Sequence, residues 1–313
     1  MLAKSIEAVL TLFILISIGW ILSRLKWIKV EEKSFLNKLI IKICIPALTI
    51  NNLFSSFTRE FIISSFKYLL IVFFFYMAIT ILVLLLAIAF RVNKKDIGTF
   101  ATMAIVSNSM FFGLPINLSL YGQESLQYVL CFFMINTIVF WSIFAPMIKK
   151  KGNKDSNTLS SNLKNILNVP FLTVVISSLL IYNGVSLPNI VLKISKQLSA
   201  LVTPLACIVI GKIIYDIDFN RFKLDSKMIL ITMVRFLISP ILMFTITRLF
   251  NLPTIASKVL TVMAAMPIMM QVAIVTDMYD EGNSKYATSA IALTTLVSLF
   301  TTPLYAIILD LIL

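Results

Sequence analysis

The sequence predicts an all-α membrane protein of ten transmembrane helices, arranged as two inverted five-helix repeats. Composition gives the first support: of 313 residues, 59% are hydrophobic and 13% are charged, and the charged share is about half that of a soluble domain. Five long runs carry no charged side chain, and each is long enough as a helix to cross a hydrocarbon core of about 30 Å: Tyr68–Phe90, Ile97–Gln123, Ser125–Ile148, Asn165–Leu192 and Tyr286–Leu309.

Apolar runs and the polar residues between them define ten segments in chain order. The first half, residues 1–148, is predicted to hold Glu7–Arg24, Ser34–Phe54, Phe66–Phe90, Ile97–Tyr121 and Ser125–Ile148. The second half, residues 168–313, is predicted to hold Asn168–Ser186, Ile190–Tyr215, Met228–Phe250, Ser257–Met278 and Tyr286–Leu311. Residues 149–167 are polar and rich in Lys, Ser and Asn, which is typical of a flexible linker. We interpret the first apolar run as a membrane helix rather than a cleaved signal peptide, because so many further spans follow it.

Lys and Arg residues are distributed unevenly between the loops. Sixteen of the 27 follow the odd-numbered segments, and six lie at the N-terminus or after the even-numbered ones. The positive-inside rule then places the 149–167 linker in the cytoplasm and both termini outside a cell membrane. The net charge of +13 therefore indicates membrane topology and contact with anionic membrane lipid, not binding to nucleic acid.

Prolines occupy matching places in the two halves. Pro46 and Pro204 lie in the second and seventh segments, 158 residues apart, and Pro115 and Pro267 lie in the fourth and ninth, 152 residues apart. Because five spans are an odd number, the second half must enter the membrane from the opposite side, as in the inverted repeats of secondary transporters. Proline lacks an amide donor and clashes with the preceding turn. We therefore predict that segments four and nine are broken near their middle and that Pro115 and Pro267 each open a second half-helix.

Polar residues flank both predicted breaks, and broken backbone at membrane depth is tolerated only against protein or a water-lined cavity. Amides freed at half-helix N-termini carry partial positive charge, which suits an anion. The candidate solute-binding residues are Asn108, Ser109, Pro115, Asn117, Asn136, Pro267 and Gln271. A simple kink at each proline is the alternative, and Asn117 and Ser109 are also suited to capping a half-helix.

Each charged residue inside the segments has two possible interpretations. Lys42 and Arg235 either extend to the lipid headgroups or attract an anionic solute. Asp277 either carries a coupling ion or faces the cytoplasm beside Asp280 and Glu281, which we favour. Trp20, Trp27 and Trp141 lie near segment ends and fit an interfacial aromatic belt.

Several function classes lack the residues they need. The chain has no histidine, its cysteines Cys44, Cys131 and Cys207 are far apart in apolar runs, and only one acidic residue is a candidate for membrane burial. An intramembrane enzyme, a metal site and a bound cofactor are therefore not expected. No phosphate-binding loop of the GxxxxGK[ST] type is present, so ATP-driven transport by this chain is not expected either.

Short motifs in a fixed order resemble the auxin efflux carrier family, which includes plant PIN proteins and bacterial malate permeases. They are the run from Asn108 to Pro115, Pro204-Leu-Ala, the run from Ala264 through Pro267 to Tyr279, and the Ser/Thr-rich Ala287–Pro303. The resemblance covers the whole chain and implies ten spans with broken helices four and nine that cross at the substrate site. It also implies a dimer-forming scaffold of spans 1, 2, 6 and 7, and a transport domain of spans 3–5 and 8–10 that moves like an elevator.

The resemblance carries over to single positions as well. Asn108 matches an amide of the first broken helix, and Pro115 and Pro267 match the crossing points. Asn136 and Thr137 fall where plant members have a Tyr-Thr pair near the substrate, and Gln271 stands where many bacterial members have Asn. We therefore expect a homodimeric secondary transporter of a small organic anion, either a carboxylate or an auxin-like compound. A channel or a non-transporting sensor on the same fold remains the alternative.

Overall fold

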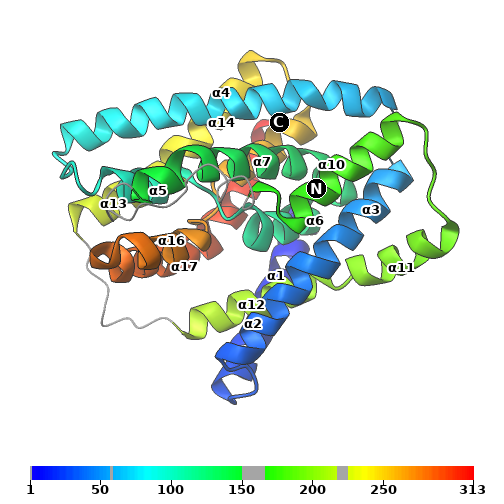
Figure 1. The fold of residues 1–313 in the computed structure, drawn as a ribbon, viewed down its shortest axis with the longest axis horizontal. Coiled ribbons are helices and arrows are strands. Elements are labelled where there is room, and N and C mark those ends of the chain that lie inside the picture. Colours follow the sequence, from blue (N-terminus) through cyan, green and yellow to red (C-terminus); the bar gives the residue numbers. More distant parts are fainter. Residues whose placement is uncertain (1, 57–58, 150–165, 217–224) are drawn as a thin grey trace.

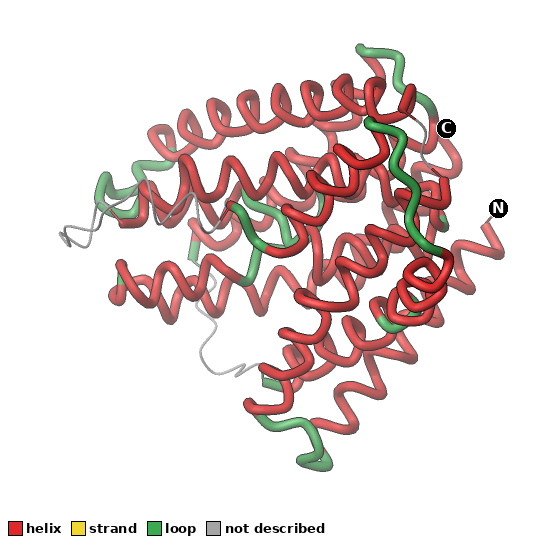
Figure 2. The backbone as a smooth tube through the Cα atoms, turned by 45° about the vertical axis from the view of Figure 1, so that its right-hand side comes forward, coloured by secondary structure: helices red, strands yellow, loops and turns green. Residues whose placement is uncertain are grey.

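The computed structural model describes residues 2–56, 59–149, 166–216 and 225–313. Helices account for nearly all of these residues, and the described part contains no strand beyond one isolated antiparallel bridge between Ser107 and Ile268 (Figure 2). The all-α prediction is thereby confirmed for the described residues. Most of the predicted 149–167 linker lies outside them.

The first half of the chain folds into long helices with short interruptions (Figure 1). A continuous helix is built from α2 (Val30–Leu39), a π-turn η1 (Ile40–Cys44) and α3 (Ile45–Ser56). The other elements are α1 (Leu2–Arg24), α4 (Arg59–Ala89), α5 (Ile97–Ile105), η2 (Ser109–Gly113), α6 (Leu114–Tyr121), η3 (Gln123–Ser125), α7 (Leu126–Val139), η4 (Phe140–Phe144) and α8 (Ala145–Lys149).

The second half follows a similar sequence of elements. Its helices are α10 (Val169–Tyr182), α11 (Asn189–Ser199), α12 (Val202–Tyr215), α13 (Ser226–Met233), η7 (Val234–Ile238), α14 (Ser239–Leu249), α15 (Thr254–Ala264), α16 (Gln271–Tyr279) and α17 (Glu281–Ile312). Each predicted segment overlaps one of these helices or a consecutive group of them. The seventh segment has an interruption that we did not predict, between Ser199 and Val202.

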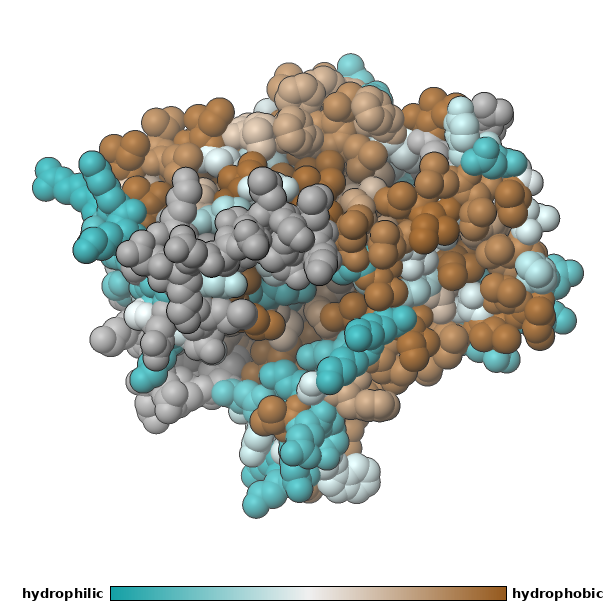
Figure 3. Space-filling view, in the orientation of Figure 1, coloured by the Kyte–Doolittle hydropathy of each residue, from teal (hydrophilic) through white to brown (hydrophobic). Residues whose placement is uncertain are grey.

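Length and hydrophobicity qualify six described helices to cross a membrane, and three shorter apolar helices accompany them. The long ones are Val30–Ser55, Ser65–Ala89, Gln123–Ile148, Asn189–Tyr215, Ser226–Leu249 and Gly282–Ile312, and the short ones are Phe13–Arg24, Val169–Tyr182 and Thr254–Ala264. Large apolar side chains are exposed along the helices, and Figure 3 shows hydrophobic residues over much of one face. Hydrophilic residues gather there at the left edge and the lower tip, as expected for a surface that meets lipid. The number of ten crossings remains a prediction.

Prolines explain the four described π-turns. Each ends two residues before a proline: η1 before Pro46, η2 before Pro115, η4 before Pro146 and η7 before Pro240. A proline ring clashes with the carbonyl four residues earlier in an α-helix. Widening the preceding turn to the π form relieves this clash without ending the helix. At these positions the helix therefore continues past the proline.

The helices α1 and α12 pack backbone to backbone through two glycines. A β-carbon added to Gly19 would lie 2.2 Å from the carbonyl oxygen of Ile208, and one added to Gly211 would lie 2.2 Å from that of Ile16. Close approach of this kind is how small residues hold membrane helices together.

Candidate functional site

The fourth and the ninth segments each lose their regular helical hydrogen bonds over a few residues. In the fourth segment α5 ends at Ile105 and η2 begins at Ser109, and in the ninth α15 ends at Ala264 and α16 begins at Gln271. The two interruptions lie against each other. Asn108 N–H donates to the Pro267 carbonyl at 2.8 Å, and Met269 N–H donates to the Val106 carbonyl at 3.1 Å. Ser107 and Ile268 form the antiparallel bridge between these two bonds.

Side chains from neighbouring helices bind the outer edges of this short pairing. Asn136 of α7 accepts from Ser107 N–H and donates to the Ser107 carbonyl, both at 3.1 Å, so its amide acts as the next strand would. Tyr76 of α4 donates its hydroxyl proton to the same Asn136 oxygen. On the opposite edge, Ile268 N–H donates to the Thr294 hydroxyl of α17 at 3.3 Å. These partners satisfy the backbone groups of the break in an apolar interior, where an unpaired backbone group costs several kcal/mol.

The expectation that each proline opens a second half-helix is wrong for Pro267, whereas Pro115 does lie at the start of α6. The fourth segment breaks at residues 106–108, well before Pro115, which lies in the first turn of α6 directly after the η2 π-turn. Pro267 lies inside its break and does not open α16, which starts at Gln271. The reason is that partners fix the break: Asn136 and the opposite chain supply hydrogen bonds at Ser107 and Asn108, whereas the π-turn alone accommodates Pro115.

Arg235 of η7 lies at the same crossing and is fully buried, so it does not extend to the headgroups. Its Nε donates to the Met266 carbonyl at 2.9 Å, and Nη2 donates to the same oxygen and to the Ser107 hydroxyl at 2.6 Å. Nη1 lies 3.5 Å from the Ala104 carbonyl. The guanidinium thus binds the C-terminal ends of α5 and α15, where the helix dipole is negative.

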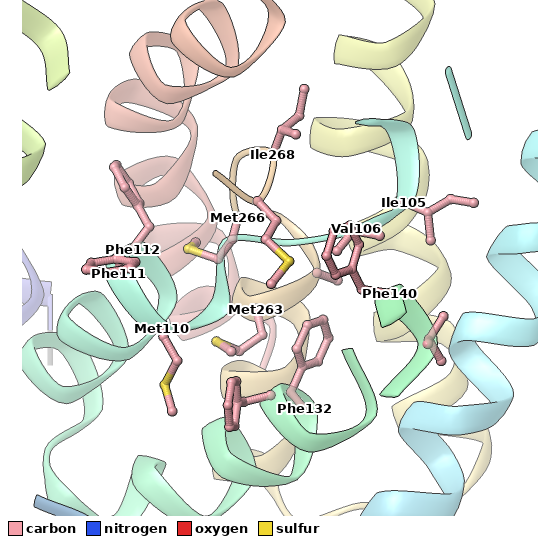
Figure 4. Packing of buried hydrophobic residues seen from close by; sticks show 14 of the residues in the cluster. Ile105, Val106, Met110, Phe111, Phe112, Phe132, Phe140, Met263, Met266 and Ile268 are labelled. Carbon is pink, nitrogen blue, oxygen red and sulfur yellow. The ribbon is translucent and has the colours of Figure 1, made fainter. Parts of the chain in front are cut away.

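Hydrophobic residues from both breaks fill the space around the crossing. Figure 4 shows Met263 and Met266 between Phe112 on one side and Phe140 on the other. Gly113 permits this contact, because a β-carbon there would lie 2.7 Å from the Met263 sulfur. The crossing is therefore rigidly packed, with its polar groups directed at specific partners.

A cavity of about 270 Å³ opens beside the crossing. Asn108, Ser109 and Gln271 line it, together with Thr137 and Asn168, and its apolar wall includes Ile41, Ile45, Phe111, Phe133, Trp141 and Met269. The N-terminal turns of η2 and α16 both border it, since Ser109, Met110, Met269 and Gln271 are among the lining residues. Helix N-termini carry partial positive charge, and none of the lining residues is charged. The cavity is suited to a small, partly apolar, anionic molecule.

The other predicted site residues do not line this cavity. Pro115, Asn117, Asn136 and Pro267 are buried, and Pro115 lines a separate, smaller pocket with Phe13 and Cys207. Asn117 donates to the Gly113 carbonyl at 2.8 Å, one turn earlier in the chain. Lys42 is exposed on the outer surface of η1, which agrees with contact to headgroups. The side chain of Asp277 lies outside the described residues, so its role stays a prediction.

Sequence reasoning missed part of the cavity wall. The sequence predicts Trp141 in an interfacial belt, yet it is half-buried and lines the cavity. The sequence predicts Asn168 as the start of a segment, and its side chain also caps α10 by accepting from Phe171 N–H at 3.1 Å. An N-cap signature was visible in the sequence. Nothing local indicated that this cap would face α7 across the cavity.

Comparison with known proteins gives matches along almost the whole chain. A family model described as "Membrane transport protein" matches residues 4–306. An uncharacterized transporter of Methanocaldococcus jannaschii is 25% identical over 309 residues, which cover 97% of this chain and 98% of the relative. An uncharacterized transporter of Methanothermobacter thermautotrophicus has the same identity and the same coverage.

Proposed function

We propose that this chain, which belongs to the membrane transport protein family, is a secondary transporter that carries a small organic anion across the cell membrane by alternating access. The family membership confirms the resemblance to auxin efflux carriers and identifies a multi-pass membrane transporter. The solute class, the mechanism and the orientation are our inference.

The observation that carries the proposal is the electrostatic character of the cavity at the crossing. Two helix N-termini border the cavity, and no carboxylate lines it. Arg235 places a buried positive charge close to the cavity. Its guanidinium donates to Ser107, which directly precedes the lining residues Asn108 and Ser109. In a medium of low dielectric constant such a charge acts over several ångströms. An anionic solute is therefore favoured over a cationic one.

The position of the cavity supports movement between two groups of helices. Ile41, Ile45 and Pro170 come from the helices assigned to the scaffold, whereas Asn108 and Met269 come from those assigned to the transport domain. A second cavity of about 240 Å³ lies along the same boundary, between Leu53 of α3, Val175 of α10 and Cys131 of α7. Phe133 faces the first cavity and Met134 the second. The two cavities thus border different faces of α7 along the same boundary, where movement of one group of helices against the other would expose the site in turn to each side.

Topology and driving force complete the proposal. Ten spans in two inverted repeats, with both termini outside, put the first cavity on the cytoplasmic side, where Asn168 follows the linker. An exported anion gains about 2.3 kcal/mol per charge at 100 mV, which is enough to drive transport without a coupling ion. Spans 1, 2, 6 and 7 would hold the scaffold in the membrane as a homodimer.

Substitution of Asn108 in reconstituted liposomes tests the site. A thermal-shift screen of organic acids and auxin-like compounds first identifies ligands, and flux of the hits is then measured. Asn108→Ala should weaken binding about tenfold, because a buried amide that bonds a charged group contributes roughly 1.5 kcal/mol or more. Asn183→Ala, at an exposed helix end, is the matched control and should leave flux unchanged.

The rival functions give different results in the same assay. Flux that never saturates and shows no counter-exchange would identify a channel. Tight binding without flux would identify a sensor. Unchanged binding of every ligand in Asn108→Ala would contradict our assignment of the site.

A further inference from the structure

The oxygens that bind Arg235 share one chemical feature. Ala104 is among the last residues of α5, and Met266 follows the end of α15, so both contribute carbonyls from half-helix C-termini. Ser107 adds a hydroxyl oxygen from the break itself. In secondary transporters with broken helices, unwound carbonyls and half-helix C-terminal ends coordinate the coupling Na⁺. This set of oxygens has the chemistry of a monovalent-cation site.

The guanidinium of Arg235 occupies that set completely from within the protein. Its Nε, Nη1 and Nη2 each reach an oxygen of the set, and its side chain is not exposed at all. No carboxylate in the part of the chain that the structure describes forms an ion pair with it. The crossing therefore holds a positive charge that no acidic side chain of the described residues pairs with. Burial of a charge in a membrane interior is costly, and charged residues there usually mark a functional site.

We propose that Arg235 is a tethered cation that fills a monovalent-cation site at the helix crossing, so that solute binding and flux need no Na⁺ or K⁺. The charge stays with the protein through every cycle, and an anion binds next to a crossing that is already positive. A dissociable cation would have to arrive with each solute. Removing the side chain should leave a small oxygen-lined hole that accepts Na⁺ or free guanidinium. Only the flux measurement below rests on the proposed transport function.

The test compares the purified wild-type protein with Arg235→Ala in media of choline, Na⁺ or K⁺, with millimolar guanidinium added in parallel. Melting temperature is measured in detergent, and flux of an organic anion is measured in liposomes. The wild type should give the same melting temperature and flux in all media. Arg235→Ala should have a lowered melting temperature in choline that rises with Na⁺ or guanidinium, and its flux should recover by roughly tenfold, the effect of regained charge-assisted hydrogen bonds.

Arg248→Ala is the matched control, because Arg248 lies on the same segment but is exposed. It should show no response to either cation. The melting-temperature measurement needs no solute, so it decides the proposal even if no transported anion is found.

Two results would overturn the proposal: wild-type protein that requires Na⁺ for flux or for stability, or folded Arg235→Ala that responds to neither cation. If the alanine variant cannot be purified in any medium, Arg235→Lys replaces it. The lysine ammonium keeps the charge, so that variant should have a lower melting temperature but no dependence on Na⁺. A melting temperature of Arg235→Lys that rises with Na⁺ would contradict a tethered cation.

Discussion

Two helix crossings in this molecule are built in opposite ways. The helices α1 and α12 cross as uninterrupted helices, and Gly19 and Gly211 bring their backbones into contact. The segments α5–η2 and α15–α16 cross through their breaks, and hydrogen bonds from Asn136, Thr294 and Arg235 replace the helical ones. The first crossing depends on shape alone. The second depends on polar partners, and it is the one that borders the cavity.

The difference indicates that one crossing is suited to rigid packing and the other to binding a solute. Backbone contact through glycine leaves no polar group unpaired and gives a rigid element, suited to a scaffold. A crossing held by side chains places helix ends, a buried cation and a cavity in one place. Such an arrangement can bind a solute, but each of its hydrogen bonds is a point where one substitution causes damage.

The largest effect is expected at the crossing that depends on shape. Gly211→Ala adds a β-carbon 2.2 Å from the Ile16 carbonyl and 2.5 Å from the Trp20 amide nitrogen, so α1 and α12 must separate. We expect the free energy of unfolding to fall by about 4 kcal/mol or more, which is at the upper end for overpacking of a buried contact. The measurement is the melting temperature of the purified protein.

Gly282→Ala is the control for this change, because a β-carbon there meets no atom within 4 Å. It should leave the melting temperature nearly unchanged. A wild-type melting temperature for Gly211→Ala would mean that the two helices do not touch through their backbones.

A smaller effect is expected at the polar crossing. Asn136→Ala leaves the Ser107 N–H and the Tyr76 hydroxyl without their partner, whereas the Ser107 carbonyl still accepts from Ser109 N–H at 2.9 Å. One buried backbone N–H and one buried hydroxyl without partners should cost about 3 kcal/mol in the free energy of unfolding. We also expect most flux to be lost, because Ser107 precedes the cavity residues Asn108 and Ser109.

Thr294→Val provides the comparison on the opposite edge of the same pairing. It removes the single bond to Ile268 N–H, at 3.3 Å, and should cost about 1 kcal/mol. Denaturant unfolding of both variants measures the two values. Equal losses would contradict the unequal support that the two edges receive.

The sequence predicted the helices and the existence of the two breaks, since charge-free runs and prolines are local features. It did not locate the first break, because Asn136 lies 29 residues after Ser107 and their pairing is visible only in three dimensions. Arg235 illustrates the same limit: a lone charge in an apolar segment has the same pattern whether it reaches lipid or caps helices α5 and α15. Three of the predicted solute-binding residues, Asn108, Ser109 and Gln271, line the cavity because they adjoin the breaks, whereas Trp141 and Asn168 line it without having been predicted there.

The smallest effect on stability is expected from a substitution at Thr137, which should change solute affinity without changing folding. Thr137 lines the cavity, and its buried hydroxyl has no hydrogen-bond partner among the described residues. Thr137→Val replaces that hydroxyl by a methyl group of similar size, so stability should change by less than about 0.5 kcal/mol. Solute affinity should fall about fivefold, because one neutral hydrogen bond contributes about 1 kcal/mol.

Thr302→Val is the matched control, since Thr302 also carries a buried hydroxyl without a described partner but lies away from this cavity. Titration calorimetry of both variants with the same ligand measures the difference, and equal affinities would mean that the bound solute does not contact Thr137.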